Sequence, residues 1–577
     1  MSKNWRELIS QPKYGIKVEK GIFVSMRDGV SLAVNVYRPD AAGKFPVLFA
    51  MGGYGKELQE VLIPPQPLNK SAIWDGNIEA GDSSQIVPRG YVHVIADTRG
   101  IGDSEGEFCG MYTQQEGRDG ADIVEWIARQ PWCDGNVGMI GYSYYGNVQL
   151  RVAIQQPPHL KAIFASHLRD DFYDTAYPGG ILSLFLYGLW DGRHGTSGFA
   201  PRNAVSQMMK TLPEDEFERR RQELLNDIDI RYYPNLYHLL NYPLKNPAFF
   251  DMVMNPLNGP FWEARSVYPF YDKIKVPAYI VGKIGGAAGY LDIYQGINTV
   301  KKLLVKPTGP EERPWREDID LIVRWYDHWL KGNDTGIMDE PPIKIFIPGA
   351  NQYRYEQEWP PKNIEYTGVY LRRWEGLSFE PELLQPDPDC FLQQPLHLST
   401  KRDSVRYISP ALPADLEVTG PAAIKIYASI DTDDTNWIVR LGALTPDGRE
   451  LRVSSGMLKA SHRAVDTAKS TPYSPCHPHT SAEPVRPGEI NEYHISLGDV
   501  VNVFKAGQRI KVEISSLISP RDPEIQIHYH PILNSARTTL HKVYRNSEYR
   551  SHLVLPVVAG KAAVTEILSD ENFLGGL

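Results

Sequence analysis

The sequence of 577 residues contains only four cysteines, Cys109, Cys133, Cys390 and Cys476, and none of them form a C-x-x-C pair. So sparse a set cannot build a disulfide framework or a cysteine-rich zinc cluster, and we expect reduced thiols. Nowhere do about 18 apolar residues follow one another, the length that a membrane-spanning helix needs. The first residues also lack the apolar core of a secretory leader. These absences predict a cytoplasmic protein.

Charge of one sign is not concentrated anywhere in the chain. Its 61 basic and 70 acidic side chains give a net charge of −9, and the lysines and arginines are dispersed. A protein that binds nucleic acid or an anionic membrane needs a basic patch, so we exclude both classes. We predict a small-molecule substrate as the partner and leave a homodimer open.

Glycine, proline and aromatic residues, by contrast, are plentiful. The chain has 48 Gly, 45 Pro and 32 Tyr. This composition is typical of a turn-rich protein with many short strands and an aromatic pocket.

The first third of the chain alternates strand-like and helix-like segments. Three short apolar runs, 45–51, 91–97 and 137–141, are flanked by Gly or Pro, as is typical of parallel strands buried on both faces. Between the last two, residues 119–128 have apolar side chains at helical spacing. Strand, helix, strand predicts a parallel sheet, so the fold class is α/β.

Two later regions differ from this pattern. Residues 172–265 look helical and predict a cap over the C-terminal edge of the sheet. After about residue 345 the helices vanish, and short alternating segments separated by turns predict an antiparallel sandwich. We therefore divide the chain into a sheet domain of residues 1–171 and 266–345, a helical cap of residues 172–265, and a β-sandwich of residues 346–577.

Ser143 lies where a predicted strand gives way to a helix, within Met139-Ile-Gly-Tyr-Ser-Tyr-Tyr-Gly. A sharp turn there would project the hydroxyl above the sheet and aim the next backbone N–H at a substrate, as in a nucleophile elbow. The spacing is G-x-S-x-x-G, because Tyr145 stands where the second glycine of G-x-S-x-G is expected. We predict Ser143 as the nucleophile, and a helix N-cap is the structural alternative.

Seven sequence motifs, spread over nearly the whole chain, carry a resemblance to a known family and occur in that family's order. They are Arg27–Pro39, Ala96–Phe108, Gly141–Gly146, Tyr177–Gly180, Tyr326–Gly332, Gly420–Ser429 and Asn502–Ser516. In these motifs the chain resembles the CocE/NonD hydrolases, the family of cocaine esterase, α-amino-acid ester hydrolase and X-prolyl dipeptidyl peptidase. The resemblance implies an α/β-hydrolase domain with an inserted helical cap, followed by a C-terminal all-β jelly-roll.

The resemblance also implies how Ser143 would act. In the family the serine attacks an acyl carbonyl, and the developing oxyanion is held by the N–H after the serine and by a tyrosine hydroxyl from the loop after an early strand. Here these donors are the Tyr144 backbone and Tyr54. Two such donors can each contribute about 3 kcal/mol in a dry site. The structural alternative for Tyr54 is a packing aromatic on a glycine turn.

The other two members of the triad are missing at their family positions. Gly285 stands where the resemblance places the acid, and the loop that should supply the histidine, residues 305–313, has none. Sliding the alignment retrieves Asp292 as an acid, whereas the nearest downstream histidine, His328, is implied to be structural. The resemblance therefore predicts a degenerate triad with a non-standard base.

Several side chains are candidates for that base, and each also has a structural interpretation. His167, with Asp170 or Asp171, follows a strand at the edge where ligands of open α/β sheets bind. Lys283 would act as a base if desolvated, and is otherwise a solvated loop residue. The remaining candidates are Glu311, Glu312 and His194.

Aromatic residues of the elbow and the cap predict an apolar binding site, although most of them would also suit a core. The candidate substrate-binding residues are Tyr142, Tyr173, Tyr177, Trp190 and His194. No nucleotide-binding or metalloprotease motif occurs, and the isolated pairs His477/His479 and His528/His530 do not argue for a metal. We therefore predict neither a cofactor nor a metal.

Three functions remain open. The first is a serine acyl-hydrolase acting on an ester or amide of a small, hydrophobic substrate. The second is an isomerase, cyclase or lyase in which Ser143 and Tyr54 polarise a carbonyl. The third is a catalytically silent binding protein that retains the pocket.

Overall fold

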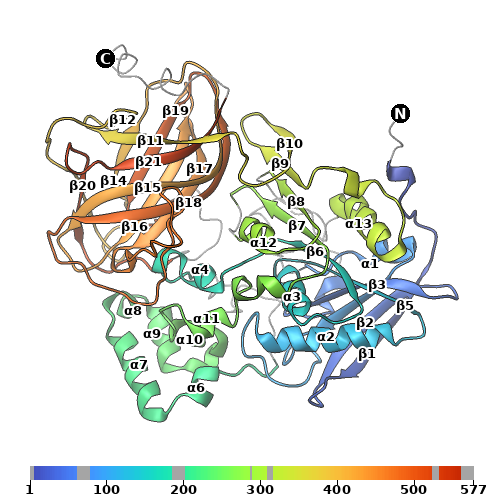
Figure 1. Cartoon of the computed structure of the whole chain (residues 1–577). Coiled ribbons are helices and arrows are strands. Elements are labelled where there is room, and N and C mark those ends of the chain that lie inside the picture. Colours follow the sequence, from blue (N-terminus) through green and yellow to red (C-terminus); the bar gives the residue numbers. More distant parts are fainter. Residues whose placement is uncertain are drawn as a thin grey trace.

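The chain folds into a central sheet flanked by helices and a second, all-β unit (Figure 1). The computed structural model describes residues 5–60, 78–184, 202–285, 289–307, 316–522 and 532–559. The predicted α/β class with a C-terminal all-β domain is confirmed.

The central sheet has ten strands in the order β1-β2-β4-β3-β5-β6-β7-β8-β9-β10. Neighbours from β4 to β9 run parallel, and β1, β2 and β10 are antiparallel to their neighbours. The strands are β1 (Ile16–Ser25), β2 (Ser31–Pro39), β3 (Phe45–Gly52), β4 (Val92–Asp97), β5 (Cys133–Tyr142), β6 (Leu160–Ser166), β7 (Ala278–Lys283), β8 (Lys301–Lys306), β9 (Ile343–Ile347) and β10 (Gln352–Glu356).

Helices cover both faces of this sheet (Figure 1). On one face, α2 (Gln114–Ala128) packs against α3 (Ser143–Ile154), so closely that a Cβ on Gly120 would lie 2.3 Å from the Val152 side chain. On the other face, α13 (Ile319–Lys331) lies over β5, where a Cβ on Gly138 would lie 2.4 Å from the Tyr326 ring. The remaining helices of this unit are α1 (Ser83–Ile86) and α12 (Tyr290–Gly296). The core strands are apolar throughout because helices bury both faces.

Short helices fill the insertion between β6 and β7. They are α4 (Phe172–Ala176), α6 (Gln207–Thr211), α7 (Glu214–Asn226), α8 (Ile228–Arg231), α9 (Pro234–Asn241), α10 (Pro247–Val253) and α11 (Pro260–Glu263). Figure 1 shows α6 to α10 grouped below the all-β unit. The described part of the insertion is helical, as its sequence pattern predicts.

The second unit joins eleven strands around its own apolar core. Alternation of buried and exposed side chains is clear in β13, for example, as expected for a strand with one wet face. The strands are β11 (Ile364–Arg372), β12 (Gly376–Ser378), β13 (Asp389–Gln393), β14 (Ser404–Ile408), β15 (Leu416–Ile430), β16 (Asn436–Leu444), β17 (Glu450–Lys459), β18 (Asn491–Phe504), β19 (Arg509–Ser515), β20 (Thr539–Tyr544) and β21 (His552–Val558).

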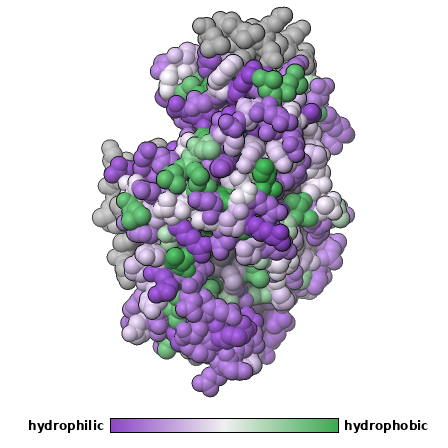
Figure 2. Space-filling model, turned by 90° about the vertical axis from the view of Figure 1, so that its left-hand side faces the viewer, coloured by the Kyte–Doolittle hydropathy of each residue, from purple (hydrophilic) through white to green (hydrophobic). Residues whose placement is uncertain are grey.

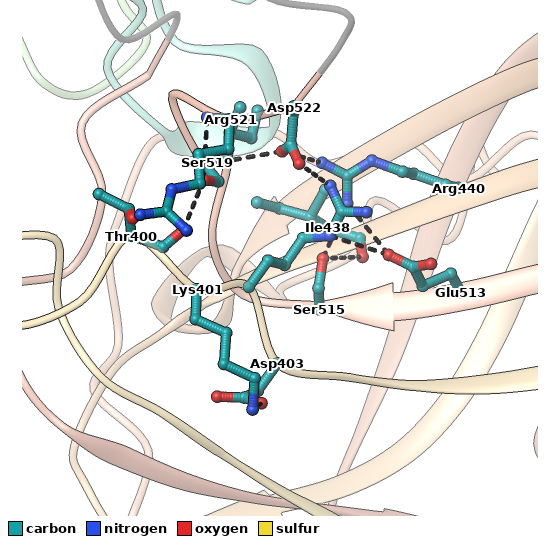
Figure 3. A network of polar contacts seen from close by, with 12 residues as sticks. Thr400, Lys401, Asp403, Ile438, Arg440, Glu513, Ser515, Ser519, Arg521 and Asp522 are labelled. Carbon is teal, nitrogen blue, oxygen red and sulfur yellow. Dashed lines mark hydrogen bonds and ion pairs between the residues drawn. The ribbon is translucent and has the colours of Figure 1, made fainter.

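A network of opposite charges joins β16 and β19 of this unit to the segments before β14 and after β19 (Figure 3). Its members are Arg402, Arg440, Glu513 and Asp522. Asp522 is 3.3 Å from the Arg440 guanidinium and also pairs with Arg402. Arg402 lies 3.0 Å from Glu513, and Arg440 donates a hydrogen bond of 2.9 Å to Ser515 Oγ. Each charged side chain of this network therefore has an opposite charge beside it.

The two units interlock at the turn between β9 and β10. The Val503 N–H donates to the Pro348 carbonyl at 2.9 Å, and a Cβ on Gly349 would lie only 2.1 Å from the Val503 carbonyl oxygen. The predicted domain boundary at residue 345 falls inside β9, so the central sheet continues past it. The remaining predicted boundaries stay predictions.

The face shown in Figure 2 is mostly hydrophilic, with apolar residues scattered in small groups. In the described ranges, the helices are too short or too polar to cross a membrane.

Candidate functional site

Ser143 occupies a strained turn at the C-terminal edge of the central sheet. β5 ends at Tyr142 and α3 begins at Ser143, whose φ of +50° lies in the left-handed region that few non-glycine residues adopt. Such strain persists only where the surroundings impose it, and it is a known property of nucleophile elbows. The backbone therefore has the elbow conformation that the sequence predicts.

Two glycines make this turn sterically feasible. A Cβ on Gly141 would lie 2.5 Å from the backbone of Tyr145, and a Cβ on Gly146 would lie 2.5 Å from the Ser166 carbonyl oxygen. The side chain of Tyr145, which stands in place of the usual glycine, fits because Gly52 leaves room: a Cβ there would lie 2.4 Å from the Tyr145 ring. The G-x-S-x-x-G spacing is thus accommodated by a third glycine on β3.

Tyr54 lies beside the elbow, in the loop after β3. Its side chain is buried, and its ring centroid is 5.6 Å from that of Tyr144 and 6.4 Å from that of Tyr145. The loop thus brings Tyr54 against the two residues that follow Ser143.

A buried carboxylate, that of Glu79, also lies at the elbow. Its Oε2 accepts a hydrogen bond of 2.8 Å from the Tyr144 N–H, and its backbone carbonyl accepts one of 3.0 Å from the Tyr142 N–H. Gln59 Oε1 in turn accepts from the Glu79 N–H at 2.7 Å, and the Glu79 residue is only 2% exposed. The N–H that the family resemblance assigns to the oxyanion hole is therefore bonded to a carboxylate in this structure.

No described side chain forms a hydrogen bond with the Ser143 hydroxyl. Asn147 Nδ2 donates to the backbone carbonyl of Ser143 at 2.7 Å. Asn147 Oδ1 also accepts from the Arg169 N–H at 2.9 Å, which ties the elbow to the segment after β6. The serine is positioned through its backbone and not through a histidine of this part of the chain.

His167, the first alternative base, follows β6 next to the elbow. The sheet pairs Tyr142 with Ser166, so His167 stands in line with Ser143. Its ring stacks on Tyr142 with centroids 4.0 Å apart, and its Nδ1 is 2.9 Å from Ser166 Oγ. The structure thus brings His167 to the elbow without a hydrogen bond to the serine.

Acidic side chains gather beyond His167. Asp171 is the N-cap of α4 and accepts from the Tyr173 N–H at 2.8 Å, and burial raises its pKa. Burial also raises the pKa of Asp170 to about 8, and the negative charge of the nearby Asp292 contributes to this rise. The Tyr271 hydroxyl beside Asp170 partly offsets this rise in pKa. Proximity to other carboxylates and lack of water favour the protonated acid here.

The loop that should carry the family acid is shaped by glycines. A Cβ on Gly282 would lie 2.3 Å from the Tyr290 ring, and one on Gly289 would lie 2.6 Å from the Asp170 N atom. Lys283, another alternative base, ends β7 with a half-buried side chain, and its carbonyl accepts from the Tyr290 hydroxyl. Gly285, which stands at the family position of the acid, has no side chain and so provides no carboxylate.

Beneath the elbow lies a second buried carboxylate, Glu116. It is in α2, forms a capping box with Thr113, and accepts a hydrogen bond from the Tyr144 hydroxyl. Burial raises the pKa of Glu116 to about 7. Arg151 lies nearby with its guanidinium 4.8 Å from the Tyr112 ring centroid, and burial lowers its pKa to about 10. Tyr144 is thus held at both its N–H and its hydroxyl by carboxylates.

The predicted substrate-binding residues are distributed unevenly. Tyr142 lines the elbow, whereas Tyr173 and Tyr177 are buried, stack on each other at 5.4 Å and donate to the backbone carbonyls of Pro256 and Met252. Both therefore pack in the insertion, and their contact with substrate stays a prediction. The other candidates, Trp190, His194, Glu311 and Glu312, lie outside the described residues.

His328 lies at the wrong end of the sheet for catalysis. Asn136 Nδ2, near the start of β5, donates to the Leu330 carbonyl at 3.2 Å, which places the end of α13 at the opposite end of β5 from Ser143. The His328 ring contacts Trp329. Its structural interpretation is thus supported. In the described ranges, no three His, Cys, Asp or Glu residues are arranged to hold a metal ion.

Sequence reasoning missed Glu79 and Glu116. Glu79 lies in Asn77-Ile-Glu-Ala-Gly-Asp82, which matches no catalytic motif, and its partner Tyr144 is distant in the sequence. The capping-box pattern of Thr113 and Glu116 was a readable signal, but it predicts a helix start and not a contact with the elbow.

Two family models match the chain. The X-Pro dipeptidyl-peptidase (S15 family) model matches residues 28–309, and the X-Pro dipeptidyl-peptidase C-terminal non-catalytic domain model matches residues 335–554. Cocaine esterase of Rhodococcus sp. (strain MB1 Bresler) is 27% identical over 610 residues, which cover 94% of this chain and 98% of that protein.

Solved structures support the same fold. A CocE/NonD family hydrolase from Staphylococcus aureus has a TM-score of 0.73 at 23% identity and covers 95% of this chain and 97% of that one. An α-amino acid ester hydrolase has a TM-score of 0.71 at 18% identity, with coverage of 95% and 97%. At these identities the likeness carries the fold alone.

Proposed function

The chain belongs to the CocE/NonD family of hydrolases, and we propose that it cleaves an ester or amide bond of a small, largely apolar substrate through Ser143. One observation carries this proposal: the φ of +50° at Ser143, held by Gly141 and Gly146 at the C-terminal edge of the sheet. A serine placed in a strained elbow presents its hydroxyl to a ligand above the sheet.

In the proposed reaction Ser143 Oγ attacks the substrate carbonyl and forms an acyl-enzyme, which water then hydrolyses. The negative charge that develops on the carbonyl oxygen is held by the Tyr54 hydroxyl and the Tyr144 N–H. Because the Tyr144 N–H is bonded to Glu79 at rest, the substrate oxygen must take over this donor. The proposed base is not a histidine at its family position.

The side chains around the elbow support an apolar substrate. Tyr54 and Tyr142 border Ser143 with largely buried rings, and the Tyr112 ring packs at 5.2 Å from that of Tyr144. Aromatic walls bind apolar acyl or ring groups, while a few polar groups fix the orientation.

The direct test is an activity-based fluorophosphonate, which reacts with an activated serine. We expect covalent labelling of the wild-type protein at Ser143, identified by mass spectrometry of the modified peptide, and no labelling of Ser143→Ala. A panel of p-nitrophenyl esters should be hydrolysed by the wild type, with kcat/KM at least about 10³-fold lower in Ser143→Ala. Equal hydrolysis by both proteins would contradict the role of Ser143.

A second candidate function is a non-hydrolytic isomerase, cyclase or lyase on the same scaffold. It is favoured by the Ser143 hydroxyl, which lacks a partner among the described residues, and by the occupied Tyr144 N–H. In that case Ser143 and Tyr54 would donate hydrogen bonds to a carbonyl without covalent attack. Substrate turnover by a protein that the fluorophosphonate fails to label would favour this candidate.

A further inference from the structure

The carboxylate of Glu79 lies across the backbone of Ser143. The backbone carbonyl of Glu79 accepts a hydrogen bond of 3.0 Å from the Tyr142 N–H, just before the serine. Its side-chain Oε2 accepts one of 2.8 Å from the Tyr144 N–H, just after the serine. Because Tyr144 directly follows Ser143, the bond to the Tyr144 N–H places the Glu79 carboxylate at the peptide group next to the serine. Glu79 is thus positioned by the same two peptide groups that form the elbow.

The position of Glu79 is rigid because its backbone is held on both sides. Gln59 Oε1 accepts from the Glu79 N–H at 2.7 Å and from the Ala80 N–H at 3.0 Å. Gln59 itself is buried and donates from Nε2 to the Gly55 carbonyl at 3.3 Å, in the loop that carries Tyr54. Gln59 therefore links Glu79 to the predicted oxyanion-hole loop.

The surroundings of Glu79 suit proton transfer. It is 2% exposed, and its negative charge is near the buried Tyr112 and Tyr145, whose pKa values burial and this charge raise. A general base must also lie within hydrogen-bond reach of the proton that it takes, directly or after a small side-chain rotation.

We propose that Glu79 is the base that accepts the Ser143 proton, in place of the family histidine; this inference rests on the proposed acyl-hydrolase function. As Ser143 Oγ forms its bond to the substrate carbonyl carbon, the Oγ–H bond breaks and the proton passes to Glu79 Oε2. The carbonyl π electrons move to the oxygen. On collapse, the bond to the leaving group breaks, and the leaving group takes the proton from Glu79. Water repeats the same steps to release the acid and restore Ser143.

This proton transfer also resolves the conflict at the Tyr144 N–H. An ionised Glu79 holds that donor by a charge-assisted hydrogen bond and would repel a second negative oxygen. Once Glu79 carries the serine proton it is neutral, so its bond to the N–H weakens and the repulsion disappears. The N–H then becomes available to the substrate oxyanion at the step in which that charge forms.

Two of the other candidate side chains near the elbow have partners of their own. The Nδ1 atom of His167 is engaged with Ser166 Oγ, and Asp171 caps α4. Of the described carboxylates, Glu79 is the one bonded to the backbone of a residue adjacent to Ser143 in sequence.

The test compares Glu79→Gln with Glu60→Gln. Glutamine keeps the shape and can still accept from the Tyr144 N–H, but it cannot take a proton. Glu60 is a matched control next to Gln59 in the sequence, where it binds Lys20 near the surface. We expect Glu79→Gln to reduce both the fluorophosphonate labelling rate and kcat/KM for p-nitrophenyl esters by about 10² to 10⁴-fold, and Glu60→Gln to match the wild type.

A second variant separates proton transfer from folding. Glu79→Ala leaves space for a small carboxylate, so added formate should restore part of its esterase rate in a saturable way. Formate should not accelerate the wild type or Ser143→Ala. Circular dichroism and thermal unfolding check that each variant is folded.

The outcomes distinguish this inference from the proposed function. If the wild type is labelled and Ser143→Ala is inactive, but a folded Glu79→Gln keeps its rate within about threefold, the role of Glu79 is overturned and the hydrolase stands. A folded Glu79→Ala that formate does not rescue also counts against it. Failure of the wild type itself to be labelled or to hydrolyse esters would instead overturn the proposed function.

Discussion

The charged network of the all-β unit and the edge of the central sheet differ in how their key polar groups are paired. In the network of Figure 3, Arg402, Arg440, Glu513 and Asp522 each have an opposite charge within ion-pair distance. At the sheet edge, the half-buried Ser143 hydroxyl has no hydrogen-bond partner among the described residues. Buried charges are normally paired, whereas the hydroxyl of a nucleophile has to be open to its substrate.

The largest effect should come from breaking the paired network. Asp522→Ala removes the carboxylate shared by Arg402 and Arg440, which leaves buried positive charge with less compensation. We expect a loss of about 3–5 kcal/mol in the free energy of unfolding, measured with urea, while esterase activity at 25 °C is retained. A loss of activity without a loss of stability would mean that the all-β unit takes part in the reaction.

At the sheet edge the expected effect is on rate and not on stability. Tyr54→Phe keeps the buried ring and its contacts with Tyr144 and Tyr145 but removes the hydroxyl. If that hydroxyl holds the oxyanion, kcat falls about 10²–10³-fold, equivalent to about 2.7–4 kcal/mol of transition-state stabilisation. The check is kcat for a p-nitrophenyl ester together with the urea midpoint. An unchanged kcat would assign Tyr54 to packing.

Glu116 tests the region beneath the elbow through pH. Its folded pKa of about 7 lies above the ordinary glutamate value of 4.5, because burial penalises the charged form. The folded state therefore binds the proton more tightly, and its contribution to stability is present below pH 4.5 and is lost as the pH rises through about 7. We expect Glu116→Gln to reduce the stability lost between pH 5 and pH 8 by about 1–3 kcal/mol, measured by unfolding at both values. An identical pH dependence in both proteins would contradict this.

The smallest effect should come from an exposed pair beside the network. Lys401 lies 2.5 Å from Asp403, but the Lys401 side chain is 74% exposed. Water screens such pairs, so Lys401→Met should change the free energy of unfolding by no more than about 1 kcal/mol. This variant is the control for Asp522→Ala, and a comparable loss in both would remove the distinction between buried and exposed pairs.

Local sequence patterns predicted the fold well. The apolar runs 45–51, 91–97 and 137–141 are strands of a parallel sheet. These predictions succeed because burial on both faces of a strand determines the residue types of a short contiguous segment. The boundary at residue 345 was less predictable, since β9 and β10 alternate like the strands of the sandwich but pair with the central sheet.

The candidate site was only partly predictable. Ser143 and its glycines form a contiguous motif, so the elbow could be recognised. Glu79 could not, because its bond to Tyr144 joins segments 65 residues apart and has no motif of its own. The cytoplasmic location, the small-molecule partner and the absence of a cofactor stay predictions, and the homodimer remains open.

The interlocked turn between β9 and β10 affects how this protein can be engineered. Any residue other than glycine at position 349 would collide with the Val503 carbonyl, so the turn fits only a partner surface of matching shape. A chimaera that takes its all-β unit from another hydrolase therefore has to bring a compatible turn with it. The natural point of exchange lies before β9, and the hairpin travels with the downstream half of the chain.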